Sequence, residues 1–87
     1  MNVRVWRVID TSGREYRAEA SPAKEPLYRN LDGFACTLEY KGRGGWGTAR
    51  SWERDEREAV VRAALDAHIQ IREVLDPREQ STAEQLA

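Results

Sequence analysis

The side chains best suited to chemistry are arginines and tryptophans that alternate within one short segment. Residues 46–52 (WGTARSW) place Trp46, Arg50 and Trp52 at even spacing, so these residues share one side of an extended strand. Indole rings and guanidinium groups can stack on a partner, and both residue types are enriched at interface hot spots. We therefore expect a partner-binding surface made of Arg43, Trp46, Arg50, Trp52, Arg54 and Arg57.

A second interpretation of the same segment stays open. The chain has only seven aromatic residues, so both indoles of the segment can instead belong to the core beneath a helix. Gly47, Ala49 and Ser51 lie on the opposite side of the strand, and small side chains there let a helix approach closely. The sequence alone does not decide whether Trp46 and Trp52 are core or surface.

Patterns for catalysis and for metal binding are weak by comparison. The single cysteine, Cys36, excludes an internal disulfide and a cysteine-based zinc cluster, and its apolar strand predicts a buried thiol. The single histidine, His68, falls on the apolar stripe of a predicted helix, which favours a hydrogen-bonded or edge-exposed core histidine over a general base. Acidic residues within 53–58 alternate with arginine and indicate a solvated helix face. We expect no enzyme, no metal and no cofactor.

A glycine-rich loop, GRGGWG at residues 42–47, deserves comparison with phosphate-binding loops. Those loops use glycine so that backbone amides can approach phosphate oxygens, and they lead into the N-terminus of a helix. This loop joins two predicted strands and lacks the spacing of nucleotide-binding fingerprints. We interpret it as a hairpin turn.

Strands and one helix must position these residues. Alternating apolar and polar residues predict four strands in two hairpins, over residues 3–9 with 14–20 and 34–40 with 46–52. Bulky residues on both faces of 3–9 predict a central or bulged strand. Two prolines and Gly33 predict a crossover over residues 21–33, with a short helix from Pro26.

From Glu53 to Leu75 the apolar spacing changes to a helical period, with Ser51 as the expected N-cap. A helix of that length exceeds what seven-residue strands can cover. Ile69 lies outside the main stripe, so we expect it to be covered either by the crossover and tail or by a second chain, as a helix face for a partner or a dimer. The predicted fold is therefore α+β, a small antiparallel sheet of about four strands packed against one long C-terminal helix. A single domain over residues 1–78 would precede a polar tail, 79–87.

Charge and hydropathy narrow the class of function. The 87 residues carry 14 basic and 15 acidic side chains, a net charge of −1, which argues against nucleic-acid binding by bulk charge and against an acidic DNA mimic. No apolar run approaches the length of about 20 residues that spans a membrane, and the first residues lack the apolar centre of a secretory signal. We expect a cytoplasmic protein.

These observations favour a non-enzymatic protein–protein interaction module. Its size and character suggest a phage or mobile-element accessory protein that inhibits a host complex by occlusion, as anti-CRISPR proteins do. The partner would be a protein, for example in a nucleic-acid-processing complex, and a homodimer is also considered. The alternative is a small nucleic-acid-binding protein that uses the Arg/Trp strand and the glycine loop.

Overall fold

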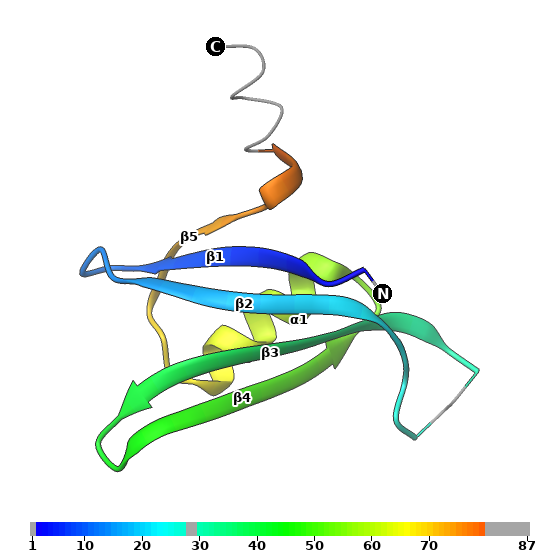
Figure 1. Ribbon diagram of the computed structural model, residues 1–87, viewed down its shortest axis with the longest axis horizontal. Helices are drawn as coiled ribbons and strands as arrows, with labels where there is room; N and C mark the ends of the chain where they lie inside the picture. Colours follow the sequence, from blue (N-terminus) through cyan, green and yellow to red (C-terminus); the bar gives the residue numbers. More distant parts are fainter. Residues whose placement is uncertain (1, 28–29, 80–87) are drawn as a thin grey trace.

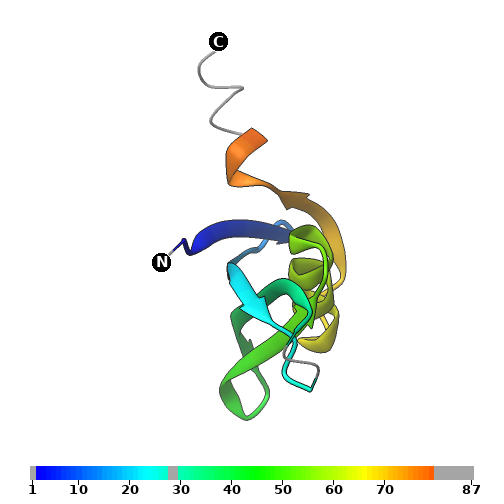
Figure 2. The same ribbon diagram turned by 90° about the vertical axis from the view of Figure 1, so that its right-hand side faces the viewer.

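The computed structural model describes residues 2–27 and 30–79, so most of the predicted tail lies outside the described residues. In chain order the elements are β1 (Arg4–Asp10), β2 (Glu15–Lys24), β3 (Asp32–Gly42), β4 (Gly45–Glu53), α1 (Glu56–Asp66) and β5 (Ile71–Leu75). Five antiparallel strands form one sheet in the order β4-β3-β2-β1-β5, and α1 lies on one side of it (Figures 1 and 2). The α+β class is confirmed, with five strands in the described chain where about four were predicted.

Both predicted hairpins are present, but the prediction of a crossover over residues 21–33 is wrong. β2 continues through Pro22 to Lys24 and pairs with β3 from Asp32 onward. Proline is tolerated there because β1 pairs with β2 only as far as Ala20, so Pro22 has no ladder bond to lose on that side. The short helix expected from Pro26 falls partly on residues 28–29, outside the described residues.

The helix starts later than the sequence predicted. Asp55 is the N-cap, and its carboxylate accepts a hydrogen bond from the backbone N–H of Glu58 at 3.1 Å. Ser51, the expected cap, belongs to β4, because pairing with β3 continues to Glu53. The buried stripe of α1 consists mainly of alanine, at positions 59, 63 and 64, with Val60. Small side chains let the helix pack closely on a sheet core of Trp6, Val8, Ala18, Ala20, Cys36, Leu38 and Ala49.

The helix also ends earlier than predicted, after 11 residues. His68 adopts a left-handed conformation (φ 62°), which breaks the helix, and the N–H of Ile69 bonds back to the Ala64 carbonyl at 3.0 Å. The remaining residues form β5, which pairs with β1 with a register shift at Ile9/Asp10. The prediction that the first strand is central or bulged is thereby confirmed, and the long C-terminal helix is wrong.

Because α1 is shorter than predicted, His68 and Ile69 lie outside the helix. His68 lies beyond the end of α1 and is exposed, so it is not on the apolar stripe of a helix as predicted. Ile69 lies in the connection between α1 and β5 and is only 7% exposed within the core, so it cannot form a helix face for a partner. The overhanging helix on which that prediction depended does not exist.

A buried carboxylate joins the start of the helix to the first strand. Glu56, which the sequence placed on a solvated face, is 6% exposed. One of its oxygens accepts hydrogen bonds from the Trp6 indole N–H at 2.5 Å and from Arg4 Nε at 2.8 Å. Arg78 lies over the Trp6 ring, 5.8 Å from its centroid. The charge is therefore paired and satisfied, as a buried carboxylate requires.

Candidate binding surface on the open sheet face

The strand β4 has two contrasting sides. Ser51 faces α1, and its hydroxyl donates to the carbonyl of Ala59 at 2.5 Å, while Ala49 is 7% exposed in the core. The other side of β4 turns away from α1 and carries Trp46, Thr48, Arg50 and Trp52. The prediction that small residues allow a helix to approach this strand is confirmed, and the alternative that both indoles lie beneath the helix is wrong.

The most exposed of these side chains is Trp46, whose exposed fraction is 75%. Arg50 is also exposed, and within the described chain no hydrogen bond or ion pair joins it to another residue. An indole left in water at this fraction gains little from folding, because its apolar surface stays unburied. Trp46 and Arg50 are therefore exposed side chains on the side of β4 that faces away from α1.

Trp52 lies on the same side of β4 but is only partly exposed. Its ring covers Gly33, where an added Cβ would come within 2.2 Å of ring carbon Cζ2. Its indole N–H donates to the carbonyl of Ala23 in β2 at 2.9 Å. Trp52 is therefore mainly a structural residue that ties β4 across β3 to β2.

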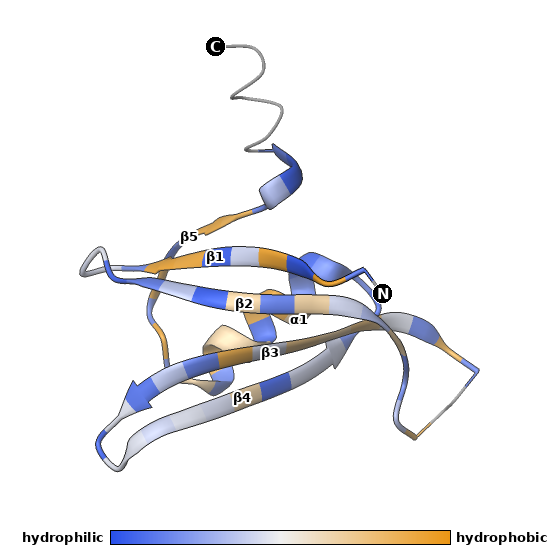
Figure 3. Ribbon diagram, viewed as in Figure 1, coloured by the Kyte–Doolittle hydropathy of each residue, from blue (hydrophilic) through white to orange (hydrophobic). Residues whose placement is uncertain are grey.

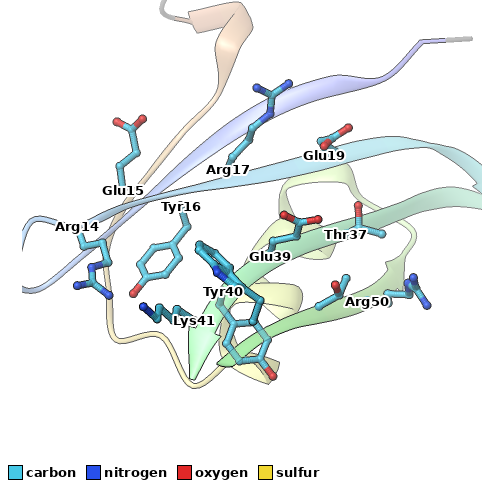
Figure 4. Close-up of a pocket in the computed structure, with 12 residues that line it drawn as sticks. Arg14, Glu15, Tyr16, Arg17, Glu19, Thr37, Glu39, Tyr40, Lys41 and Arg50 are labelled. Atoms are coloured by element: carbon cyan, nitrogen blue, oxygen red, sulfur yellow. The ribbon is translucent and has the colours of Figure 1, made fainter. Parts of the chain in front are cut away.

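The two hairpins separate at the end of the sheet where Trp46 lies. Pairing between β2 and β3 stops at Ala18 and Leu38, although both strands continue beyond that pair. The space between them is a hollow of about 600 Å³ (Figure 4). Its lining combines aromatic and charged residues, namely Arg14, Glu15, Tyr16, Arg17, Glu19, Thr37, Glu39, Tyr40, Lys41, Trp46, Thr48 and Arg50. We call this hollow the inter-hairpin cleft.

Charges of both signs line the inter-hairpin cleft. Four basic side chains and three carboxylates contribute to its walls. Glu15 is already paired with Arg7, with Nη2 and Oε1 2.7 Å apart, so its charge is partly neutralised. The remaining balance is slightly basic, which does not provide the strongly positive surface that backbone binding of nucleic acids requires.

One wall of the cleft is stiffened by the turn between β1 and β2. Asp10 Oδ1 accepts hydrogen bonds from the Ser12 hydroxyl at 2.6 Å and from the Arg14 N–H at 2.9 Å. The Tyr16 hydroxyl donates to Asp10 Oδ2 at 3.1 Å. The Ser12 hydrogen bond is the main reason that the pKa of Asp10 falls to about 2, whereas burial raises the pKa of Tyr16.

The structure distributes the six predicted partner-binding residues over several places. Trp46 and Arg50 line the inter-hairpin cleft, while Arg43 is exposed in the turn between β3 and β4. Arg54 lines a second hollow beside Pro22 and Phe34, and Arg57 lines a third along α1. The six therefore do not form one continuous surface, although a role for each in binding stays a prediction.

Sequence reasoning missed the residues that β2 and β3 contribute to the cleft. The alternation over residues 14–20 and 34–40 had placed Arg17 and Glu39 on the faces opposite the apolar residues, which was the available signal. The pattern could not show that β2 and β3 are neighbours, or that their pairing ends at Ala18 and Leu38. The aromatic walls, Tyr16 and Tyr40, follow from that separation.

The thiol and the acidic residues offer no second site. Cys36 is 1% exposed, so the predicted buried thiol is confirmed, and burial raises its pKa to about 12. Among residues 2–27 and 30–79, no three histidine, cysteine, aspartate or glutamate side chains are grouped so that they could hold a metal ion. The helix of the described chain is neither long nor apolar enough to cross a membrane.

No protein family model, no curated protein and no solved structure matches the chain.

Proposed function

We propose that this protein is a non-enzymatic protein–protein interaction module whose partner binds the open face of the sheet at the inter-hairpin cleft. The observation that carries the proposal is the 75% exposed indole of Trp46, which lines the same cleft as the exposed Arg50. Tryptophan and arginine that stand exposed next to a concave surface are the residues that most often dominate binding energy. Tyr16 and Tyr40 also line the cleft, where both rings are partly buried against the core.

The mixed charges support a protein partner over a nucleic acid. Basic Arg17, Lys41 and Arg50 stand among acidic Glu19 and Glu39, so a partner must offer both signs of charge to match this surface. Complementary charges of that kind contribute specificity and association rate more than affinity. A phosphate backbone would meet repulsion from the carboxylates.

Within this class, we favour an inhibitor that acts by occlusion, of the kind that phages and mobile elements direct against host complexes. A rigid sheet with a projecting aromatic residue can block an assembly or nucleic-acid-binding surface without any chemistry of its own.

Partner capture by two single variants tests the proposal. Tagged wild-type protein, Trp46→Ala, Arg50→Ala and the control Arg72→Ala would each be incubated with host lysate, and captured proteins identified by mass spectrometry. Arg72 is an exposed arginine on β5, at the far edge of the sheet. We expect a partner that wild type and Arg72→Ala retain and that both cleft variants lose while keeping the wild-type melting temperature. Equal capture by all four proteins would refute the proposed surface.

A second candidate, binding of single-stranded nucleic acid, is favoured by one observation. An exposed indole on an open sheet face, with Arg17, Lys41 and Arg50 nearby, is an arrangement on which bases can stack. Titration of single-stranded oligonucleotides at low salt would then quench the fluorescence of Trp46, and added salt would reverse the effect. Unchanged fluorescence at low salt would remove this candidate.

A further inference from the structure

The outer edge of β4 is long and regular. In the part of the chain that the structure describes, no strand pairs with β4 on the side away from β3. β4 keeps one unbroken register with β3 over nine pairs, from Phe34 with Glu53 to Gly42 with Gly45, so no bulge twists its edge away. Between Gly45 and Trp52 the strand has no proline and no lysine, and Arg50 is its only charged residue. These are the features of an edge that accepts another strand.

The opposite edge of the sheet is protected. β5 has five residues, its pairing with β1 contains a register shift, and Pro77 follows it closely. Short length, irregular pairing and nearby proline are the usual ways in which proteins prevent edge-to-edge association. The contrast within one sheet singles out β4 as the edge left able to pair.

The hydrogen-bond pattern shows which backbone groups that edge presents. The Asp10 N–H bonds to the Arg14 carbonyl at 2.9 Å, which fixes the alternation of bonded pairs between β1 and β2. The registers of β2 with β3 and of β3 with β4 are constant, so the same alternation extends across the sheet to β4. It directs the N–H and C=O groups of four β4 residues outward, away from β3. These residues are Trp46, Thr48, Arg50 and Trp52.

The side chains of β4 are complementary to a second β4 in antiparallel orientation. Pairing about a two-fold axis at Ala49 aligns all four outward residues, with Trp46 of one copy opposite Trp52 of the other and Thr48 opposite Arg50. Cross-strand aromatic pairs stabilise a sheet, and this register places no two like charges directly opposite. On the helix side the pairs are small, Gly47 with Ser51 and Ala49 with itself.

The helix side of this edge also has apolar surface to cover. Leu65 is 55% exposed and, with the half-buried Val61, lines a hollow of about 500 Å³ that includes Glu53 at the end of β4. A second copy extends the sheet on this side, so Val61 and Leu65 of both copies lie on the same face, beside the junction. A two-fold interface uses one patch twice, as this geometry requires.

We propose that the chain forms a homodimer through antiparallel pairing of β4 with β4 of a second copy, giving one continuous ten-stranded sheet. The dimer carries two inter-hairpin clefts on its open face. The proposal concerns the edge of the sheet and does not depend on the partner proposed above. It also replaces the dimer surface that the sequence had suggested at Ile69.

The test is sedimentation equilibrium of the purified chain, wild type and Thr48 variants, over a series of concentrations. Thr48→Lys places a cation opposite Arg50 of the second copy, twice in the dimer, and should weaken dimerisation about 2- to 30-fold. Thr48→Glu places an anion there and should strengthen it by a similar factor. Thr48→Ala keeps the backbone N–H and is the matched control, with a dimerisation constant near wild type.

A backbone variant tests the strand pairing itself. Thr48→Pro removes one outward N–H, which only an edge strand tolerates, and should leave a folded monomer. The charge variants change an exposed side chain, so the test stands if the proline variant does not fold. A wild-type chain that stays monomeric at all concentrations would overturn the proposal. So would a dimer whose affinity is the same in the lysine and glutamate variants.

Discussion

Trp46 and Trp52 lie on the same side of the same strand, six positions apart, and yet they have different roles. Trp46 is 75% exposed at the mouth of the inter-hairpin cleft. Trp52 covers Gly33 and donates its indole N–H to the Ala23 carbonyl at 2.9 Å. The difference comes from the neighbouring strands, because β2 pairs with β3 beside Trp52 and has already separated from it beside Trp46.

The side of a strand on which a residue lies is set by local structure, whereas its exposure is set by tertiary structure. The two-residue repeat of a strand decides which face a side chain occupies, and it can be found in the sequence. Whether that face is covered depends on pairing between distant strands. A binding residue and a structural residue can therefore have the same local pattern, and only their surroundings separate them.

The largest expected effect is on stability at the Trp52 end. Trp52→Ala removes a ring that packs on Gly33 and leaves the Ala23 carbonyl without its hydrogen-bond donor. Because Trp52 is only partly buried, we expect a loss of about 2–4 kcal/mol in the free energy of unfolding, somewhat below the range for fully buried tryptophan. Urea denaturation measures it. A loss below about 1 kcal/mol would show that the contact is incidental.

Crowding the same contact gives a smaller effect. Gly33→Ala brings a Cβ to 2.2 Å from the Trp52 ring and to 2.7 Å from the backbone oxygen of Glu53, so the ring and the neighbouring backbone of β4 must both shift, at a cost of about 1–3 kcal/mol. Gly44→Ala is the matched control, because an added Cβ there meets nothing within 4 Å. Thermal denaturation should show a lower melting temperature for Gly33→Ala and an unchanged one for Gly44→Ala. Equal stability of the two would contradict the packing of Trp52 on Gly33.

At the other end, removal of the indole should hardly affect stability. Trp46→Ala should change the free energy of unfolding by no more than about 0.5 kcal/mol, since little of its surface is buried. Its effect should appear in partner capture. If Trp46→Ala destabilises the fold as much as Trp52→Ala does, the distinction between the two residues fails.

The smallest expected effect is the loss of stability at low pH that Asp10, at the turn beside the cleft, should cause. The pKa of Asp10 is lowered to about 2, against about 3.9 in an unfolded chain, first by the Ser12 hydroxyl. A lowered folded pKa means that the stabilisation is present above about pH 4 and is lost as the pH falls toward 2. Urea midpoints measured over this range should fall for wild type and fall less for Asp10→Asn. Identical slopes would exclude Asp10 as a contributor.

The sequence predicted the first four strands and the two sides of β4 because alternation is a local property. It failed over residues 67–75, where Ile71 and Leu75 satisfy a helical period by coincidence. There, backbone pairing with the second edge of β1 outweighs the local preference for a helix, and the chain forms β5. The same limitation applies to the candidate site, since Trp46 and Arg50 were found but the cleft beside them depends on how two hairpins separate.

The most direct test of the account is hydrogen exchange of the three indole N–H groups, followed by NMR at concentrations where the chain is monomeric. We expect slow exchange for Trp6, which is bonded to Glu56, and for Trp52, which is bonded to Ala23, and exchange at the rate of a free indole for Trp46. Trp46→Phe assigns its resonance. Protection of Trp46 in the monomer, or free exchange of Trp52, would contradict the division of β4 into a binding end and a structural end.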